Sequence, residues 1–411
     1  MVYVRFSDLK SNKWAIFSVL AFIYFFVYFH RTSPAVMADE FMREFAVSAL
    51  AVGILSSAYF YPYAVLQIPV GVLSDTKGAK WTVMVFTSIA FFGVLTLVLA
   101  FSYEMAVFSR LLIGIGVAGV YVPTVKIISV WFKHNEFATA MGILFAIGNL
   151  GAIISAYPLA LAIEVLSWRI PFVFIALISL ILLFLCWKIV EDAPTGFKEE
   201  KIRKEDLKLI LGNFSLWLIA ISAMLRYGIV MGYQGLWGGP YLIDVYGMTK
   251  GAAGTILTLV GVGTIIGSIL FGKISDSIGL KKMILILGGL GFTIAWLPLV
   301  LFTSTLDISL VCLISFLVGF FSSTGPVAYA IIKELFPLRM TGLSMSVVNV
   351  FPFFGAAIFQ TVMGYLMDSV GKVDSIYPAE AYQLSFEFCL IASIISVLCV
   401  VFVKEKQNRE S

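Results

Sequence analysis

Four basic side chains lie inside long apolar stretches of this 411-residue chain, where charged residues are rare: Arg31, Arg110, Lys126 and Arg226. None of the 24 aspartates and glutamates falls deep inside such a stretch. A charged side chain at the middle of a bilayer costs about 2.5–3.5 kcal/mol on insertion scales, so these cations need a neutralising partner. A transported anion is the simplest one, and the pattern therefore predicts an anion-binding site within the membrane.

Arg31 has the sequence surroundings of a carboxylate site. Tyr24, Tyr28 and Arg31 follow one another at i, i+4 and i+7, so on a helix they share one face. That face combines a guanidinium, which binds carboxylates through two parallel hydrogen bonds, with two phenol hydroxyls. We predict that all three side chains contact the substrate. The structural alternative is an arginine that extends to the outer membrane interface.

Arg226 is the second candidate, because it lies close to the middle of its apolar stretch, where a side chain reaches water with difficulty. Tyr233 follows on its helical face and Gln234 lies nearby, so we predict that all three contact the substrate. Arg31 and Arg226 occupy corresponding stretches in the two halves of the chain and are expected to bind one anion together. The alternative for Arg226 is a structural bond to backbone carbonyls.

Three further polar residues are weaker candidates. Lys126 is predicted to line the transport pathway, and Asn349, which lies 200 positions after Asn149, is predicted to contact the substrate. Most such amides bond between helices instead. Arg110 is expected to form a structural ion pair with Glu104 or Glu164.

His30 is the one histidine in an apolar stretch, and imidazole is the side chain that titrates near neutral pH. It is therefore the candidate for proton coupling, although it lies next to Arg31 and a neutral hydrogen-bonding role is the alternative. A single such histidine does not support a bis-histidine haem site, and the four cysteines show no metal-ligand spacing. We expect no metal and no cofactor.

Composition sets the class of protein that positions these residues. The chain is 60% hydrophobic and 13% charged with a mean hydropathy of +1.00, which excludes a soluble globular protein. Apolar stretches long enough to cross about 30 Å of hydrocarbon number twelve. They cover residues 14–36, 48–73, 81–101, 105–132, 138–163, 169–190, 213–239, 250–272, 282–303, 308–333, 340–366 and 384–403. The sequence therefore predicts an all-α, multi-pass protein of the inner or plasma membrane.

Charge distribution predicts the orientation and the domains. With both termini cytoplasmic, 20 of the 28 lysines and arginines fall on the inner side and four in outer loops, as the positive-inside rule requires. The charged segment 191–212 is expected to be a cytoplasmic linker between six-helix bundles at 1–190 and 213–411.

A ten-residue pattern occurs twice, 201 positions apart, at the inner ends of the second and eighth stretches. The copies are Gly71-Val-Leu-Ser-Asp75-Thr-Lys77-Gly78-Ala-Lys80 and Gly272-Lys-Ile-Ser-Asp276-Ser-Ile-Gly279-Leu-Lys281. We expect the first glycine of each copy to allow close helix approach, the second to permit a tight turn, and each aspartate to cap a neighbouring helix. Such a charged loop is predicted to gate the cytoplasmic side; ordinary capping with positive-inside charge is the alternative.

These loops, with Arg110-Leu-Leu-Ile-Gly-Ile-Gly116 and Trp168-Arg169-Ile-Pro171-Phe172, resemble the major facilitator superfamily over essentially the whole chain. The resemblance implies two pseudo-symmetric six-helix bundles. The run Tyr28-Phe-His30-Arg31 resembles the first span of its anion:cation symporter branch, where a Tyr-Leu-Asp-Arg run places the arginine at the substrate carboxylate; here His30 replaces the aspartate. The use of intramembrane cations is chemically similar to the family's oxalate–formate exchanger.

The sequence thus predicts a secondary transporter, not an enzyme, that moves a small organic anion such as a carboxylate by alternating access. Exchange and symport with a proton or sodium ion remain open as coupling modes. Alternatives are a proton-coupled efflux pump for drugs or other hydrophobic solutes, and an amino-acid transporter. We expect a monomer whose partners are the bilayer and the solute, with no nucleic acid.

Overall fold

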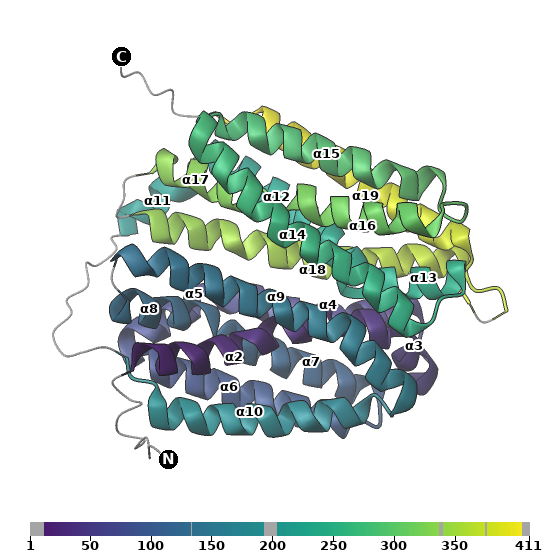
Figure 1. The fold of residues 1–411 in the computed structure, drawn as a ribbon, viewed down its shortest axis with the longest axis horizontal. Coiled ribbons are helices and arrows are strands. Elements are labelled where there is room, and N and C mark those ends of the chain that lie inside the picture. The colour runs from purple at the N-terminus through teal and green to yellow at the C-terminus, as the bar shows by residue number, and fades with distance from the viewer. Residues whose placement is uncertain (1–11, 133, 193–203, 337–339, 375, 405–411) are drawn as a thin grey trace. The chain divides into compact units, whose positions relative to one another are not determined.

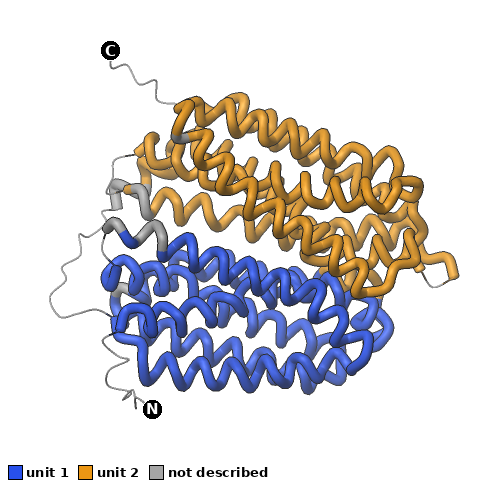
Figure 2. Tube along the Cα trace, in the orientation of Figure 1, with its two compact units in different colours: residues 1–47, 54–199 blue, residues 48–53, 200–411 orange. Residues whose placement is uncertain are grey.

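The computed structural model describes residues 12–132, 134–192, 204–336, 340–374 and 376–404, and it divides into two compact units (Figures 1 and 2). Unit 1 comprises residues 1–47 and 54–199, and unit 2 comprises 48–53 and 200–411. The described residues are helical apart from turns, loops and an isolated β-bridge between Val373 and Ile376.

Unit 1 contains the helices of the first half of the chain. They are α2 (Lys13–Thr32), α3 (Pro34–Phe45), the end of α4 (Ala49–Ser57), α5 (Phe60–Lys77), α6 (Ala79–Val98), α7 (Tyr103–Ala118), α8 (Tyr121–Trp131), α9 (His134–Val165) and α10 (Arg169–Ile189). The first residues of α4 pack with unit 2.

Unit 2 contains the helices of the second half. They are α11 (Lys204–Leu211), α12 (Phe214–Gly232), the π-helix η1 (Tyr233–Trp237), α13 (Gly238–Tyr246), α14 (Lys250–Ile278), α15 (Lys281–Leu301), α16 (Ile308–Ser322), α17 (Gly325–Leu335), α18 (Thr341–Val370) and α19 (Ala379–Val401).

Twelve segments of the described residues are long and apolar enough to cross a membrane, which confirms the predicted number of spans. They are Lys13–Thr32, Ala49–Ser74, Ala79–Val98, Tyr103–Trp131, Ala140–Val165, Arg169–Ile189, Phe214–Tyr246, Lys250–Ser275, Lys281–Leu301, Ile308–Leu335, Leu343–Val370 and Ala379–Val401. The largest difference from the sequence limits is in the seventh span, which continues through the glycines and Pro240 to Tyr246.

Glycines set the closest helix crossings in each unit. In unit 1, a Cβ at Gly114 would lie 2.2 Å from Tyr59 O, and a Cβ at Gly116 would lie 2.2 Å from Ala90 N. In unit 2, a Cβ at Gly319 would lie 1.9 Å from Val260 O. These contacts are with backbone atoms, so a side chain at any of these positions requires two helices to separate. Small residues of this kind let membrane helices pack backbone to backbone.

Three breaks in the helices place polar groups inside the units. The first span ends at Thr32, and Pro34 begins α3 immediately after Arg31 and Ser33. The tenth span changes from α16 to α17 at Ser323 and Thr324. The seventh span is π-helical over Tyr233–Trp237, where Pro240 supplies no N–H to the preceding turn. Non-α segments of this kind are frequent at functional sites.

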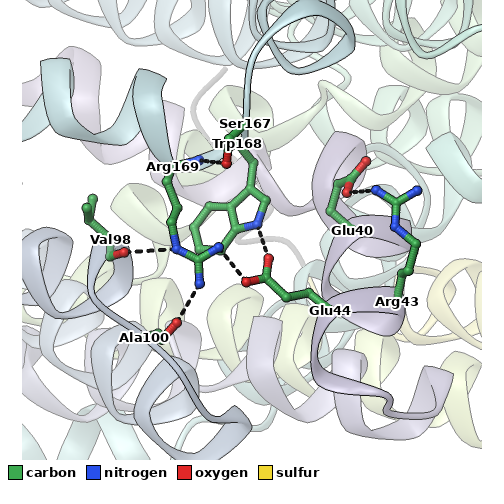
Figure 3. A network of polar contacts seen from close by, with 8 residues as sticks. All are labelled: Glu40, Arg43, Glu44, Val98, Ala100, Ser167, Trp168 and Arg169. Carbon is green, nitrogen blue, oxygen red and sulfur yellow. Dashed lines mark hydrogen bonds and ion pairs between the residues drawn. The ribbon is translucent and has the colours of Figure 1, made fainter.

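A polar network in unit 1 fixes α3, the helix that follows Arg31 (Figure 3). Glu44, near the end of α3, accepts a hydrogen bond from the Trp168 indole N–H at 2.6 Å and forms an ion pair with Arg169. Arg169 also donates to Val98 O at 3.1 Å and to Ala100 O at 2.6 Å. The network therefore ties α3 to the end of α6 and to the start of α10.

The glycine crossings predict a stability difference between two alanine variants of unit 1. Gly114→Ala should destabilise the protein by about 1–3 kcal/mol, because its methyl group meets the backbone of Tyr59. Gly142→Ala is the matched control, since a Cβ there has nothing within 4 Å; it should be neutral or stabilise the helix by up to about 1 kcal/mol. Thermal unfolding in detergent measures both, and equal midpoints would contradict the packing described.

Candidate functional site

Tyrosine rings pack around Arg31 within unit 1, and Arg31, Tyr24, Tyr28, Tyr63 and Tyr121 are called the Arg31 cluster below. Its side chain is 5% exposed, and its guanidinium carbon is 4.5 Å from the centre of the Tyr28 ring and 5.6 Å from that of Tyr63. The Tyr24 hydroxyl is 3.5 Å from the Tyr28 hydroxyl, and the Tyr24 ring stacks on Tyr121 at 5.7 Å. Aromatic faces attract a guanidinium electrostatically, so these rings hold the arginine in the apolar interior.

The residues of the Arg31 cluster and their neighbours come from four helices. Tyr24, Tyr28 and Arg31 come from α2, Tyr63 from α5 and Tyr121 from α8. Helix α9 packs against α2 and is close enough for Phe145 to contact the Tyr24 ring at 6.3 Å.

Two glycines of α9 allow this approach. A Cβ at Gly148 would lie 2.9 Å from Tyr24 Cε1, and one at Gly151 would lie 2.1 Å from Phe25 O. The predicted face of Tyr24, Tyr28 and Arg31 therefore has its three members together, and the tyrosine-rich run at 59–63 adds Tyr63 to them.

Arg110 has a different environment from the one expected. Its side chain is 1% exposed, its Nη1 donates to the His30 carbonyl at 3.0 Å, and its guanidinium lies over the Tyr59 ring at 4.9 Å. Within the described part of the chain its Nε and Nη2 have no hydrogen-bond partner. The expected ion pair with Glu104 or Glu164 is therefore wrong, because the side chain is directed inward to α2.

His30 and Arg31 are adjacent in sequence but face different groups. The His30 ring is 2% exposed and lies against Phe26, Phe29 and Phe172, with ring centres 5.7–6.3 Å apart. Arg31 lies among tyrosines instead. Adjacent helical residues point about 100° apart, and the helix therefore separates the imidazole from the guanidinium.

Arg226 is buried inside unit 2, where it is 7% exposed. Its Nη1 donates to the Thr324 hydroxyl at the break between α16 and α17. A Cβ at Gly289 on α15 would lie 2.9 Å from Arg226 Nη2 and 2.9 Å from Val397 Cγ2, so this glycine makes room for the guanidinium. Arg226 therefore bonds to a side-chain hydroxyl, whereas the structural alternative predicted from the sequence is a backbone carbonyl.

The other candidates of the seventh span have separate partners within unit 2. The Tyr233 hydroxyl is 3.1 Å from Ser315 Oγ, and the Gln234 amide donates to Leu257 O at 3.5 Å. The Trp237 indole donates to Gln360 O at 2.9 Å. Because the backbone is π-helical from Tyr233, the side chains that follow leave the face expected from a regular α-helix.

Lys126 and Asn349 both bond within their units. Lys126 Nζ donates to Ser74 O at 3.4 Å. This bond places the Lys126 ammonium group at the C-terminal end of α5, beside the first repeated loop. Asn349 Oδ1 accepts a hydrogen bond from Tyr329 at 2.9 Å.

The first repeated loop caps helix α6. Gly78 has φ +97°, and a Cβ there would lie 2.6 Å from an Asp192 carboxylate oxygen. Asp192 accepts from the Lys80 backbone N–H at 2.5 Å, and Lys80 Nζ donates to Trp187 O at 2.8 Å. A carboxylate at a helix N-terminus satisfies a free N–H group and is favoured by the helix dipole. Lys77 is exposed at the end of α5.

The second loop uses a different contact. Gly279 ends α14 with φ +73° and donates its N–H to Ser275 O at 3.0 Å, while Lys281 forms an ion pair with Glu334 at the end of α17. The side chains of Asp75 and Asp276, predicted to cap helices, lie outside the described residues.

The expectation that Gly71 and Gly272 allow close helix approach is wrong. A Cβ at either position would have nothing within 4 Å among the described atoms. The tight turns expected at Gly78 and Gly279 are present, since both have positive φ.

Sequence reasoning missed three capping or pairing acids, Asp192, Glu334 and Asp368. Asp368, near the end of α18, accepts from the N–H groups of Ala49 at 3.1 Å and Leu50 at 2.8 Å at the start of α4. All three acids lie near helix ends, but a helix end in the sequence does not reveal which distant N–H or lysine it meets.

A sequence model described as Major Facilitator Superfamily matches residues 20–249 and 223–411, and so includes both halves. The chain belongs to the major facilitator superfamily. It is therefore a multi-pass integral membrane transporter and not an enzyme, in agreement with its twelve apolar spans.

Relatives of this superfamily member match over most of their length. The uncharacterized transporter YybO of Bacillus subtilis (strain 168) is 26% identical, over 95% of this chain and 93% of that protein. The hexuronate transporter of the same organism is 23% identical, over 84% of this chain and 85% of that protein. A solved structure of a bacterial homologue of the human lysosomal transporter Spinster, inward-facing and unoccupied, has a TM-score of 0.78 at 16% identity and covers 97% and 99% of the two chains. This likeness shows a shared fold.

The first repeated loop of this superfamily member provides a matched pair of glycine variants. Gly78→Ala should destabilise the protein by about 1–3 kcal/mol, because alanine is strained at a positive φ and its methyl group meets Asp192. Gly71→Ala should leave the unfolding midpoint unchanged or slightly raised. In Asp192→Ala the second cost of Gly78→Ala is absent, so the two changes should be non-additive in a double-mutant cycle. Full additivity would contradict the contact.

The Arg226–Thr324 bond predicts a second stability difference. Thr324→Val should cost about 1–3 kcal/mol, because it keeps the shape of the side chain but leaves a guanidinium N–H buried without its acceptor. Thr324→Ser keeps the hydroxyl and should cost less than half as much. Chemical unfolding in detergent compares them, and equal losses for the two variants would contradict the hydroxyl as the group that decides the stability.

Proposed function

We propose that this chain is a secondary transporter of a small hydroxylated carboxylate, of the sugar-acid class, and that it works by alternating access. The superfamily supports secondary transport, and the chemistry of the buried charges supports an anion. Among the described residues, the charged side chains that are fully buried include Arg31, Arg110 and Arg226 but no aspartate or glutamate. An interior with this excess of positive charge favours an anion and disfavours a cationic drug.

The observation that carries the proposal is the burial of the Arg31 guanidinium among tyrosine side chains. A guanidinium offers two parallel N–H groups that match a carboxylate, and the Tyr24, Tyr28 and Tyr63 hydroxyls supply neutral donors and acceptors around it. A hydroxylated acid uses both kinds of group at once. A simple hydrophobic solute would make no hydrogen bond with these polar groups.

The relatives support the same substrate class. The hexuronate transporter of Bacillus subtilis is named for a sugar acid, which carries one carboxylate and several hydroxyls, and it matches over 84% of this chain. The proposal extends this chemical class to the present chain, with Arg31 as the carboxylate ligand and the surrounding tyrosines as hydroxyl ligands. Exchange of anions and symport with a cation are both compatible with such a site.

The remaining roles in the proposal concern the transport cycle. Both termini face the cytoplasm, and the loops at 71–80 and 272–281 act as charged gates at the inner ends of the second and eighth spans. The Lys80–Asp192 and Lys281–Glu334 contacts show that each loop is held by an acid of its own unit. Such contacts have to be stable in one state and exchangeable in the cycle, and an exposed helix cap in the first loop and an exposed ion pair in the second are both weak enough to permit this.

The test is uptake into proteoliposomes of radiolabelled glucuronate and galactonate, with glucose and a lipophilic cation as comparisons. Arg31→Gln removes a charge-assisted bond of about 1.5–3 kcal/mol, so the apparent affinity for the acid should fall about tenfold to a hundredfold. Arg31→Lys keeps the charge but loses the planar pair of donors and should give an intermediate affinity.

Arg43→Gln is the matched control. The Arg43 side chain is 77% exposed, and Arg43 lies in the last turn of α3 and not in the Arg31 cluster. It should transport the acid as the unmodified protein does. Transport of glucose or of the lipophilic cation, with no effect of Arg31→Gln, would overturn the proposed substrate class and leave the transporter assignment intact.

A further inference from the structure

A small cavity lies inside unit 1 next to His30. It has a volume of about 20 Å³ and is lined by α2, α6, α7, α10 and the short connection before α8. Its lining includes three polar side chains, His30, Thr87 and Ser179. The lining residues are Ile23, Phe26, His30, Thr87, Ala90, Val117, Val120, Ser179 and Leu182.

Two of these polar groups are buried without a partner. His30 is 2% exposed and Thr87 is 5% exposed, and within the described part of the chain neither His30 Nδ1 nor Thr87 Oγ1 has a hydrogen bond. A buried polar atom left unpaired costs about 1–3 kcal/mol, so two beside one cavity indicate a missing ligand. Ser179 donates to Ile175 O at 2.8 Å, which leaves its oxygen able to accept a further bond.

The size and chemistry of the cavity fit one water molecule. A cavity must offer roughly 10–15 Å³ to hold a water, and a buried water makes about three hydrogen bonds. The volume here is sufficient for one such molecule and too small for an organic acid. An apolar cavity of this size would stay empty, but three polar groups can bind water.

We propose that this cavity binds one ordered water molecule, held by His30, Thr87 and Ser179, and that the water keeps the His30 imidazole in a fixed neutral form. The water joins α2 to α6 and α10 at His30, the residue that precedes Arg31. His30 is then a positioning residue, which holds the segment of α2 that carries Arg31, and it is not the carrier of a coupling proton. This last point rests on the proposed transport function, whereas the water site does not.

The charges around His30 favour the neutral imidazole. Arg31 follows it on α2, and from α7 Arg110 donates to its backbone carbonyl at 3.0 Å. From α6 and α10 it meets the neutral Thr87, Ser179 and Phe172, and none of the residues that line the cavity is acidic. A further positive charge on His30, close to the Arg110 guanidinium and with no acidic side chain among the residues that line the cavity, is electrostatically unfavourable.

The decisive measurement is nuclear magnetic resonance of full-length protein in lipid nanodiscs with ¹⁵N-labelled histidine. The chain has two histidines, so His134→Gln leaves His30 as the single labelled ring. We expect a cross-peak between the ring and a long-lived water, and one neutral tautomer from about pH 5 to pH 8. Absence of the water cross-peak, or formation of the imidazolium within that range, would overturn the proposal.

Three variants test the site without relying on the fold of a single one. Thr87→Val should abolish or shift the water cross-peak, and Thr87→Ser should retain it, because only the serine keeps the hydroxyl. Ala90→Val places extra methyl groups in the cavity and should also remove the water. The same cross-peak in all three variants would show that the water, if bound, lies elsewhere.

Uptake measurements separate this inference from the proposed function. His30→Gln should slow acid uptake because it alters the water contacts, but the pH dependence of the rate should keep the shape seen with the unmodified protein. Loss of pH-driven accumulation in His30→Gln would identify His30 as the proton carrier and overturn the positioning role. Failure of the unmodified protein to take up any acid would contradict the proposed function while leaving the water measurement valid.

Discussion

The burial of guanidinium groups among apolar helices is the constraint on which the rest of this structure depends. Each of Arg31, Arg110 and Arg226 is withdrawn from water, and each is stabilised by a different kind of neighbour. Arg31 lies over tyrosine rings, Arg110 bonds to the His30 carbonyl, and Arg226 bonds to the Thr324 hydroxyl. The three partners named here are neutral, so they reduce the cost of burial without bringing an acidic side chain into the apolar interior, which fits the proposed anionic substrate.

Backbone packing makes these arginine environments possible. Gly148 and Gly289 leave the space that tyrosine rings and a guanidinium occupy, Gly151 lets α9 meet the backbone of α2, and Gly114 brings α7 against the residues around Tyr59. Helix breaks supply the polar groups that regular helices lack, as at Thr324 between α16 and α17. The sites are therefore properties of helix crossings, and a single methyl group at a crossing is expected to disturb both packing and charge placement.

The loops after α5 and α14 show how two copies of one motif can be held by different chemistry. In the first copy the Lys80 backbone N–H is capped by Asp192, whereas in the second Lys281 pairs through its side chain with Glu334. The common element is a glycine with positive φ, Gly78 or Gly279, that ends the preceding helix. Repetition of a sequence motif thus preserves the turn more strictly than the contact made around it.

The sequence by itself determined the class of protein, the twelve spans, the turns at Gly78 and Gly279, and the common face of Tyr24, Tyr28 and Arg31. These follow from hydropathy, glycine chemistry and helical periodicity, which act over a few residues. Only the tertiary structure decided that Arg110 meets the His30 carbonyl instead of Glu104 or Glu164, and that Gly71 and Gly272 lie at no close crossing. The partner of a buried charge depends on how helices distant in sequence are rotated and spaced, and local periodicity does not contain that information.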